Sequence, residues 1–347
     1  MLNLKEASKE ERAIYANRWW KTTKEKALDS IMESSQYAFI CDHELMDTLI
    51  KLDSPNIKMT KFLGSIICSD DGMRFIDETM FVDGIPNVGT TTIKFTNQTS
   101  EQCLYDYYKD GQTENNDVTV LNFASFKNPG GMFLNGSPAQ EESLCHHSTL
   151  YEVLRCFSSL YYSDHKKYLN NGLYMNDVLY TPFIKFFARS RFGNEENDIV
   201  NAESWKANVI NCAAPNLNAY GRRFSSNDTL PSHMKAIHNA LEERIETVMI
   251  VANLSRTMHL VLGAFGCGVF KNDPYDVASI FYSTILTKYV GRFKTISFPI
   301  PRGKNNNYDA FINVATRAFG NLTEVRQSDG SVRHEVTLRN PNFQATS

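Results

Sequence analysis

The sequence of 347 residues has no long apolar run and no strong excess of charge of either sign. No stretch approaches the ~20 apolar residues of a membrane-spanning helix, and residues 1–20 are too charged for a signal peptide. Lys and Arg number 36 and Asp and Glu 39, a net charge of −3, which argues against general nucleic-acid binding. The seven cysteines lack regular spacing, as is typical of buried thiols in a reducing compartment. We therefore expect a soluble protein without a membrane partner, in the cytoplasm or, if its source is eukaryotic or viral, in the nucleus.

The chain also lacks internal repeats and low-complexity linkers. From about residue 90 onward, segments with strand-like and helix-like apolar spacing succeed one another, which is typical of a layered α/β domain. Residues 1–89 have a charged, mostly helical pattern and are expected to form an extension that packs on a domain at 90–320. Residues 321–347 are polar and indicate a tail or a hairpin that turns at 328–331. Strands are expected at 91–96, 118–123, 178–180, 207–213, 258–262 and 296–300, and helices after residues 99, 137 and 273 and along 234–248.

The stretch 118–145 joins a buried strand, a glycine loop and a helix start. Residues 118–123 form a nearly continuous apolar run, as expected for a central strand covered on both faces. Asn-Pro-Gly-Gly at 128–131 interrupts the pattern, because glycine tolerates backbone angles and close approaches that other residues do not. Ser137 is expected to cap the next helix, with Gln140 closing a capping box.

Two carboxylates, Glu141 and Glu142, fall in the first turn of this helix. The helix dipole alone favours acids there, so charge complementarity is one explanation. A helical wheel that treats residues 137–161 as one helix places Glu142 roughly 60° and Glu141 roughly 160° from the centre of the apolar face. Glu142 is therefore expected to lean inward beside the glycine loop while Glu141 faces outward, which makes Glu142 the candidate general acid.

A second glycine-rich loop, Gly-Ala-Phe-Gly-Cys-Gly-Val-Phe at 263–270, follows a strand and precedes a capped helix start at 272–274. Such a loop suits an anionic phosphate, because backbone N–H groups and the helix dipole converge there. Its spacing fits neither the Walker loop nor the dinucleotide motif, and a tight structural turn explains it equally well. Two strand–loop–helix elements in one domain are stronger evidence for a diphosphate site than one, because a diphosphate needs hydrogen-bond donors on both sides.

The first loop resembles the signature of the microbial-type poly(ADP-ribose) glycohydrolases, which are built on a macrodomain. In that family a glycine triplet is followed by a spacer and then by Gln-Glu-Glu. Here Gly130 and Gly131 supply two of the three glycines, Met132 replaces the third, and residues 140–142 match fully. The segment 263–274 is similar to the family's second phosphate loop.

The resemblance covers about residues 90–315 and implies a macrodomain-like, three-layer α/β/α fold with a mixed central sheet. It also implies hydrolysis of the ribose–ribose O-glycosidic bonds of poly(ADP-ribose) on modified protein, with release of ADP-ribose and without a cofactor or metal. By the same match Glu142 protonates the leaving oxygen and then helps to activate water, and Glu141 supports it or binds the leaving ribose. Ligand contacts are implied for Asn122, Ser125, Gly130, Gly131, Gln140, Gly266, Cys267, Gly268, Val269 and Phe270.

Some of these residues have simpler explanations. Phe270, implied to pack on the ribose, is an ordinary core aromatic if the resemblance is set aside, and a structural hydrogen bond to the neighbouring loop explains Asn122 nearly as well. Cys145, His146 and His147 lack the spacing and the partners of a zinc site. Because adjacent helical residues rarely meet as a Cys/His pair, we expect Cys145 to be buried and the two histidines to be packed or exposed.

Two other functions remain open at this stage. If Met132 narrows the pocket, the resemblance would fit a mono-ADP-ribosyl hydrolase that acts on modified protein or nucleic acid. A non-catalytic, ADP-ribose-binding macrodomain is the other alternative. Turnover of poly- against mono-ADP-ribosylated substrate separates the two hydrolases, and a tight but inert complex would indicate the binding protein.

Overall fold

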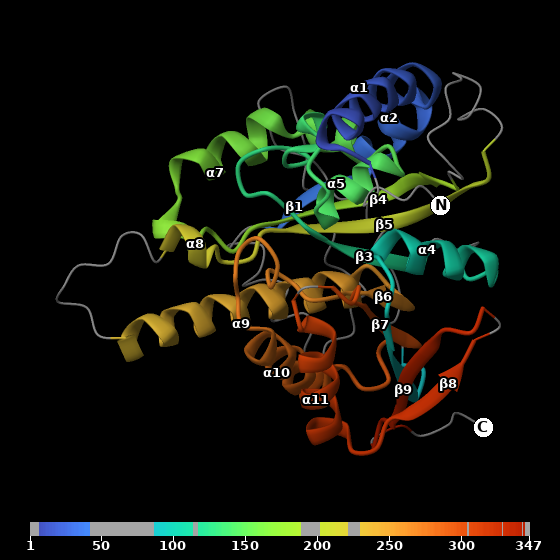
Figure 1. The fold of residues 1–347 in the computed structure, drawn as a ribbon, viewed down its shortest axis with the longest axis vertical. Coiled ribbons are helices and arrows are strands. Elements are labelled where there is room, and N and C mark those ends of the chain that lie inside the picture. The colour runs from blue at the N-terminus through green and yellow to red at the C-terminus, as the bar shows by residue number, and fades with distance from the viewer. Residues whose placement is uncertain are drawn as a thin grey trace, which may run out of the picture.

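The computed structural model describes most of the chain, namely residues 7–41, 87–113, 117–188, 202–220, 230–303, 305–327, 329–341 and 343. Within these residues the strands form one mixed, nine-stranded sheet in the order β1-β4-β5-β3-β6-β7-β2-β9-β8 (Figure 1). The strands are β1 Phe39–Cys41, β2 Thr90–Thr96, β3 Val118–Phe123, β4 Val178–Phe187, β5 Ser204–Cys212, β6 His259–Val261, β7 Thr295–Pro299, β8 Thr323–Arg326 and β9 Val332–Arg339.

The middle of the sheet is parallel. β5, β3, β6, β7 and β2 run in the same direction, and the antiparallel strands β4 and β9 flank them on either side. The carboxyl ends of the five parallel strands therefore meet at one edge. Val118, Val120 and Leu121 of β3 are fully buried, which confirms the central strand predicted from their apolar run.

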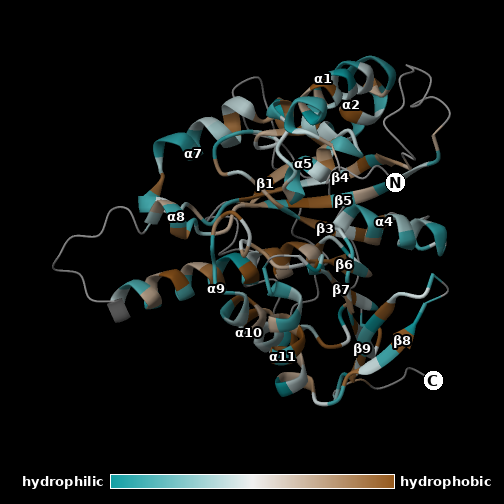
Figure 2. Cartoon of the chain, in the orientation of Figure 1, coloured by the Kyte–Doolittle hydropathy of each residue, from teal (hydrophilic) through white to brown (hydrophobic). Residues whose placement is uncertain are grey.

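Helices cover both faces of the sheet. α1, α2, α4, α5 and α6 share one apolar core with one face, and α9, α10 and α11 share a second core with the other. Hydrophobic residues concentrate along the inner strands in Figure 2, between the two helical layers. None of the described helices is long and apolar enough to cross a bilayer. The helices are α1 Lys9–Lys26, α2 Leu28–Tyr37, α4 Ser100–Lys109, α5 Gln140–His146, α6 Leu150–Cys156, α7 Ser163–Lys167, α8 Leu217–Tyr220, α9 Leu230–Leu254, α10 Pro274–Thr284 and α11 Asn307–Phe319, with short 3-10 turns at Phe133–Asn135 and Asn170–Gly172 and π-helical turns at Ser158–Tyr162 and Ile285–Tyr289.

Both ends of the described chain contribute strands. Of the helical extension predicted at 1–89, the described residues form α1 and α2, and residues 39–41 form β1, which pairs antiparallel with β4. Residues 42–86 of the predicted extension lie outside the described residues. β8 and β9 form the hairpin predicted around residues 328–331, although residue 328 itself lies outside the described part. β9 continues the sheet beside β2, so this hairpin is part of the main sheet.

Candidate active site

The candidate site lies where the chain leaves two neighbouring parallel strands towards opposite faces of the sheet. β3 continues through residues 124–139 into α5, and its neighbour β6 continues through residues 262–273 into α10 on the other face. In open α/β sheets a crevice forms at such a switch point, outside the carboxyl ends of the strands. A cleft of about 790 Å³ lies there. Its lining includes the predicted site residues Gln140, Gly266, Gly268, Val269 and Phe270.

The first glycine loop passes directly over the two carboxylates. Gly130 and Gly131 adopt φ of +65° and +59°, in the left-handed region that favours glycine. A side-chain carbon built on Gly131 would lie 2.6 Å from Glu142 Oε1 and 2.9 Å from Glu141 Oε2. Both acids therefore converge on one glycine backbone, and this close approach explains why a residue without a side chain is needed at position 131.

Glu141 is buried, with 3% of its surface exposed. Its Oε2 accepts a hydrogen bond of 2.7 Å from the Ser125 N–H, and its Oε1 accepts one of 3.4 Å from Asn122 Nδ2. Burial, followed by the nearby charge of Glu142, raises the pKa of Glu141 well above its usual range. The site thus favours the protonated, uncharged form of Glu141.

Glu142 is held by the loop that lies above it. Its Oε1 accepts a hydrogen bond of 2.8 Å from the Met132 N–H, and 5% of the residue is exposed. Met132, which occupies the third position of the glycine triplet, is half exposed, and its side chain is not among the groups that line the cleft. The backbone of Met132 thus contributes to the site directly.

The predicted orientation of Glu141 is wrong. The segment taken as one helix is two, because α5 ends at His146 and α6 begins at Leu150. The apolar residues of α6 and beyond therefore do not share an axis with Glu141 and Glu142, and the helical wheel does not apply to them. Glu141 faces inward, beneath the loop that follows β3, rather than outward.

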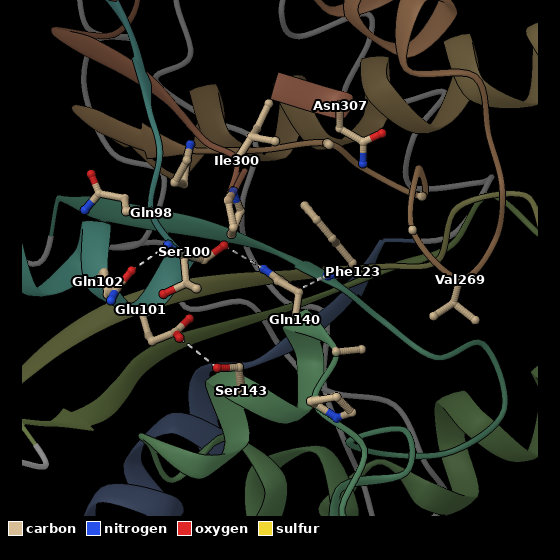
Figure 3. Close-up of a pocket in the computed structure, with 18 of the residues that line it drawn as sticks. Gln98, Ser100, Glu101, Gln102, Phe123, Gln140, Ser143, Val269, Ile300 and Asn307 are labelled. Atoms are coloured by element: carbon tan, nitrogen blue, oxygen red, sulfur yellow. Dashed lines mark hydrogen bonds between the residues drawn. The ribbon is translucent and has the colours of Figure 1, made fainter. Parts of the chain in front are cut away.

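Gln140 ties α5 to the neighbouring strand instead of closing a capping box. The helix begins at Gln140, after Ala139, so Ser137 is not the capping residue. The Gln140 Oε1 accepts from the Phe123 N–H at 2.8 Å, and its Nε2 donates to the Leu121 carbonyl at 2.8 Å. The bond between Gln140 and Phe123, dashed in Figure 3, lies at the end of β3, and the two bonds together set where the following Glu141 and Glu142 lie.

Asn122 and Ser125 lie beneath the carboxylates and do not line the cleft. The fully buried Asn122 donates from Nδ2 to Asn211 Oδ1 at 2.9 Å as well as to Glu141. Ser125 holds Glu141 through its N–H, while its Oγ accepts from the Asn128 N–H at 3.2 Å. Both residues therefore act on the carboxylate and its loop, which is the structural alternative considered for Asn122.

The second glycine loop forms one wall of the cleft. Gly266 has φ of +70°, and a side-chain carbon there would lie 2.4 Å from Asn272 Nδ2 and 2.5 Å from Ala214 Cβ. Asn272 Nδ2 donates to the Gly266 carbonyl at 3.1 Å and so closes the loop on itself. The predicted helix start is confirmed, because the Asp273 side chain accepts from the Tyr275 N–H at 2.9 Å.

Phe270 and Cys267 have different surroundings within that loop. Phe270 lines the cleft and also packs edge-on against Tyr174, with ring centroids 6.1 Å apart. Tyr174 in turn stacks on Phe126, which follows β3. Cys267 is buried, and burial raises the pKa of its thiol. Phe270 is thus both a core aromatic and a cleft residue, which unites the two interpretations made from the sequence.

The opposite wall of the cleft consists of segments that sequence reasoning missed. It is built by residues that follow β2 and β7, at the same edge of the sheet as the glycine loops (Figure 3). Carboxyl ends of parallel strands meet at one edge, so this wall was predictable only with the strand order in hand. Its residues are Asn97, Gln98, Thr99, Ser100, Glu101, Gln102, Pro299, Ile300, Pro301, Arg302 and Asn307.

α4 and α5 meet across this wall through two polar contacts. The Ser143 hydroxyl donates to Glu101 Oε1 at 2.8 Å, and Gln140 Nε2 donates to Ser100 Oγ at 3.1 Å. Figure 3 shows both contacts joining the start of α4 to α5. The helix that carries the carboxylates, α5, is thereby fixed relative to the wall that faces the second loop.

Cys145, His146 and His147 lie inside the protein, at the end of α5. All three are buried, and the Cys145 thiol lies under Gly130, where a side-chain carbon would be 3.3 Å from its Sγ. Burial raises the pKa of Cys145 well above its usual range. In the part of the chain that the structure describes, no three His, Cys, Asp or Glu side chains are grouped so as to hold a metal ion.

The mixed sheet between two helical layers, with a cleft at its carboxyl edge, defines a macrodomain-like α/β/α protein, as predicted. Residues 71–189 match the family described as "Microbial-type PARG, catalytic domain". The predicted resemblance to the microbial-type poly(ADP-ribose) glycohydrolases is thus confirmed. A search of the curated proteins finds no significant match to this sequence.

Solved structures extend the likeness beyond the matched segment. The chain is 25% identical to poly(ADP-ribose) glycohydrolase from Deinococcus radiodurans in complex with ADP-ribose, over 83% of this chain and 97% of that one, with a TM-score of 0.62. It is 25% identical to the enzyme of the same name from Thermomonospora curvata, over 88% and 99%, with a TM-score of 0.66. The similarity thus extends well beyond residues 71–189, because each comparison covers more than four fifths of the chain.

Proposed function

We propose that the protein hydrolyses the ribose–ribose O-glycosidic bonds of poly(ADP-ribose) and releases ADP-ribose, with Glu142 as general acid and base. The observation that supports this most directly is the carboxylate pair buried against Gly131, on the helix whose residues Gln140 and Ser143 line the cleft. The family match at 71–189 and the likeness to a glycohydrolase in complex with ADP-ribose support the same reaction. The extension at 1–89, the glycohydrolase domain at 90–320 and the terminal segment at 321–347 are part of the same proposal.

In this proposal the ligand spans the cleft with its diphosphate on the second loop. Near Gly268 no atom lies within 4 Å of where a side chain would begin, so a phosphate can closely approach the backbone. Val269 is 68% exposed, and Phe270 lines the cleft, so both can contact a ligand. Gly266 and Cys267 are packed inward and maintain the shape of the loop. Phe270 would pack on the ribose and hold the anomeric carbon towards the first loop.

In the proposed chemistry Glu142 acts twice, first as a general acid and then as a general base. Glu142 donates a proton to the leaving ribose oxygen as the C–O bond breaks and an oxocarbenium-like state develops. Its carboxylate then accepts a proton from the water that attacks the anomeric carbon, which restores the acid. Glu141, whose pKa is raised by burial and by the nearby charge of Glu142, supports Glu142 or binds the leaving ribose.

The proposed substrate is poly(ADP-ribose) on modified protein, in the cytoplasm. All described cysteines are free thiols, and Cys156 is the exposed one among them. Free, mostly buried thiols fit a reducing compartment, where disulfides are rare.

The test is turnover of three substrates by the purified full-length chain. We expect ADP-ribose to be released from poly(ADP-ribose), with little release of the last ADP-ribose from mono-ADP-ribosylated protein. Release from the mono-ADP-ribosylated protein or nucleic acid alone would assign the chain to the other class of hydrolase. Tight binding of ADP-ribose without turnover of any substrate would contradict catalysis.

ADP-ribose is expected to bind at least about tenfold more tightly than AMP or ribose 5-phosphate, a difference of about 1.4 kcal/mol. The reason is that the second glycine loop lines the cleft and Pro138, Ala139 and Gln140, which follow the first loop, line it as well, so we expect the ligand to be recognised along the whole diphosphate. Titration calorimetry on one protein preparation measures all three affinities. Equal binding of AMP would mean that one half of the ligand provides all the recognition, contrary to the two-loop arrangement.

Met132→Gly is expected to increase the rate on poly(ADP-ribose) chains. The substitution restores the glycine triplet of the family and removes a half-exposed side chain from the loop that holds Glu142, while the backbone N–H that binds Glu142 is kept. Met132→Ala is the matched control, because it trims the side chain without adding the backbone freedom of glycine. Unchanged rates and product lengths in both variants would show that the Met132 side chain does not restrict the substrate.

A further inference from the structure

α1 lies against residues 133–139, the spacer between the first glycine loop and Gln140. Arg12 Nε donates to the Gly136 carbonyl at 2.7 Å, and Asn17 Nδ2 donates to the Leu134 carbonyl at 3.3 Å. Gly136 has φ of +76°, and a side-chain carbon there would lie 2.1 Å from the Lys9 carbonyl oxygen. The backbone of α1 and the backbone of the spacer are therefore in direct contact, more than 100 residues apart in the sequence.

The same helix also fixes the region behind the carboxylates. Trp19 Nε1 donates to the Ser148 carbonyl at 3.1 Å, in the break between α5 and α6, and the buried Trp19 ring packs edge-on against Phe187. Trp20 packs edge-on against Tyr151, whose ring lies where a side chain on Gly130 would be placed. α1 thus holds the chain on both sides of the segment that carries Glu141 and Glu142.

The spacer connects α1 to the proposed acid through a short path. Phe133, at the start of the spacer, is fully buried against Tyr151 and His146, with ring centroids 4.9 and 4.8 Å apart. The preceding residue, Met132, donates its N–H to Glu142 Oε1 at 2.8 Å. A displacement of the spacer would therefore displace the donor that orients Glu142. The cleft lining, in contrast, includes no residue of α1.

We propose that α1 positions the acid of this active site and that Arg12 and Asn17 are positioning residues, an inference that rests on the proposed glycohydrolase function. α1 orients Glu142 through the spacer and the Met132 N–H, without contacting the ligand. Loss of its contacts lowers the rate of the chemical step and leaves binding of the diphosphate intact, because the second glycine loop, which is proposed to hold the diphosphate, leads to α10 on the other face of the sheet. The helical extension thereby becomes a component of the catalytic machinery.

The experiment compares Arg12→Ala with Arg18→Ala in the full-length chain. Arg18 is the matched control, because it is an exposed arginine on the same helix. For Arg12→Ala we expect kcat on poly(ADP-ribose) to fall roughly tenfold, within the ~10²-fold that a misplacement of 1 Å can cost. KM and the affinity for ADP-ribose are expected to stay unchanged, and Arg18→Ala is expected to behave as the unmodified protein.

Hydrogen exchange of residues 130–136 provides a readout that does not depend on activity. Arg12→Ala is expected to exchange these amides faster than Arg18→Ala, because α1 no longer restrains the spacer. An unchanged kcat in Arg12→Ala, or a loss shared equally by kcat and ADP-ribose affinity, would overturn the inference. If the unmodified protein binds ADP-ribose but hydrolyses no polymer, the proposed function is wrong. Hydrogen exchange tests the inference about α1 independently, because unchanged exchange in Arg12→Ala would show that α1 does not restrain the spacer.

Discussion

Glu142→Gln is expected to lower the rate of poly(ADP-ribose) hydrolysis by ~10²–10⁴-fold, the usual cost of losing a general acid. The carboxamide has the size of the acid, and its oxygen can still accept the hydrogen bond from the Met132 N–H. It cannot donate a proton to a leaving oxygen, however. Because the second glycine loop is untouched, the affinity for ADP-ribose should be kept. Single-turnover rates and calorimetry on the same preparation measure the two quantities.

Glu141→Gln is the matched comparison for this experiment, since it makes the same change one residue away. Glu141 lies deeper, on the Ser125 N–H, so its loss should affect the rate less than the loss of Glu142. Full activity in Glu142→Gln would rule out the proposed mechanism. Equal, modest losses in both variants, together with weakened binding, would favour a protein that binds ADP-ribose without hydrolysing it.

Gly131→Ala is expected to be nearly as damaging, with a loss of activity of at least ~10²-fold. The added methyl group would lie 2.6 Å from Glu142 Oε1 and 2.9 Å from Glu141 Oε2, so one or both carboxylates must move. The φ of +59° also disfavours any residue with a side chain. We expect the melting temperature to fall as well, because the two acids and the loop are buried together.

Gly303→Ala is the control for Gly131→Ala. A side-chain carbon on Gly303 meets no atom within 4 Å, its φ is not in the left-handed region, and the residue does not line the cleft. Activity and melting temperature should therefore match the unmodified protein. If Gly131→Ala were as active as Gly303→Ala, the close approach of the carboxylates to the loop would be irrelevant to catalysis.

The elements that were predictable from the sequence are those whose signal is local. The apolar run at 118–123 indicated a buried strand, and Asp273 with Pro274 marked a helix start, because a cap and a first-turn proline act within one turn. The two glycine loops were found for the same reason. Each follows a strand directly, so their shared position at the carboxyl edge of the sheet needed only a parallel arrangement of the two strands.

The break between α5 and α6 was not predictable from periodicity, because tertiary contacts produce it. The Ser148 hydroxyl donates to the Leu144 carbonyl at 2.7 Å and accepts from the Leu150 N–H at 3.1 Å, which replaces the helical pattern. On either side, the backbone pairs with β4, through the Thr149 N–H to the Lys185 carbonyl and the Phe187 N–H to the His147 carbonyl. A strand that comes later in the chain thus ends the helix.

Gln140 illustrates the same limit at a single side chain. Its position three residues after Ser137 suggested a local capping role, yet both ends of its carboxamide bind β3, nearly 20 residues earlier. Such a contact depends on how α5 docks on the sheet, which a pattern of residue types does not specify. The wall formed by residues 97–102 was missed for the corresponding reason, since only the strand order places β2 near the glycine loops.

The pairing of β9 with β2 affects how the chain folds during its synthesis. The hydroxyls of Thr92 and Thr337 lie 2.9 Å apart although 245 residues separate them in the sequence. A ribosome adds about 5–20 residues per second. Many seconds therefore pass between the synthesis of β2 and the synthesis of its two neighbours in the sheet, β7 and β9. Contacts over such sequence distances slow folding, and an unpaired strand edge invites association with other chains. The half of the sheet with the carboxylates can therefore form first, whereas the wall after β2 and β7 is completed last, and a chain that stops before residue 332 would leave β2 open to aggregation.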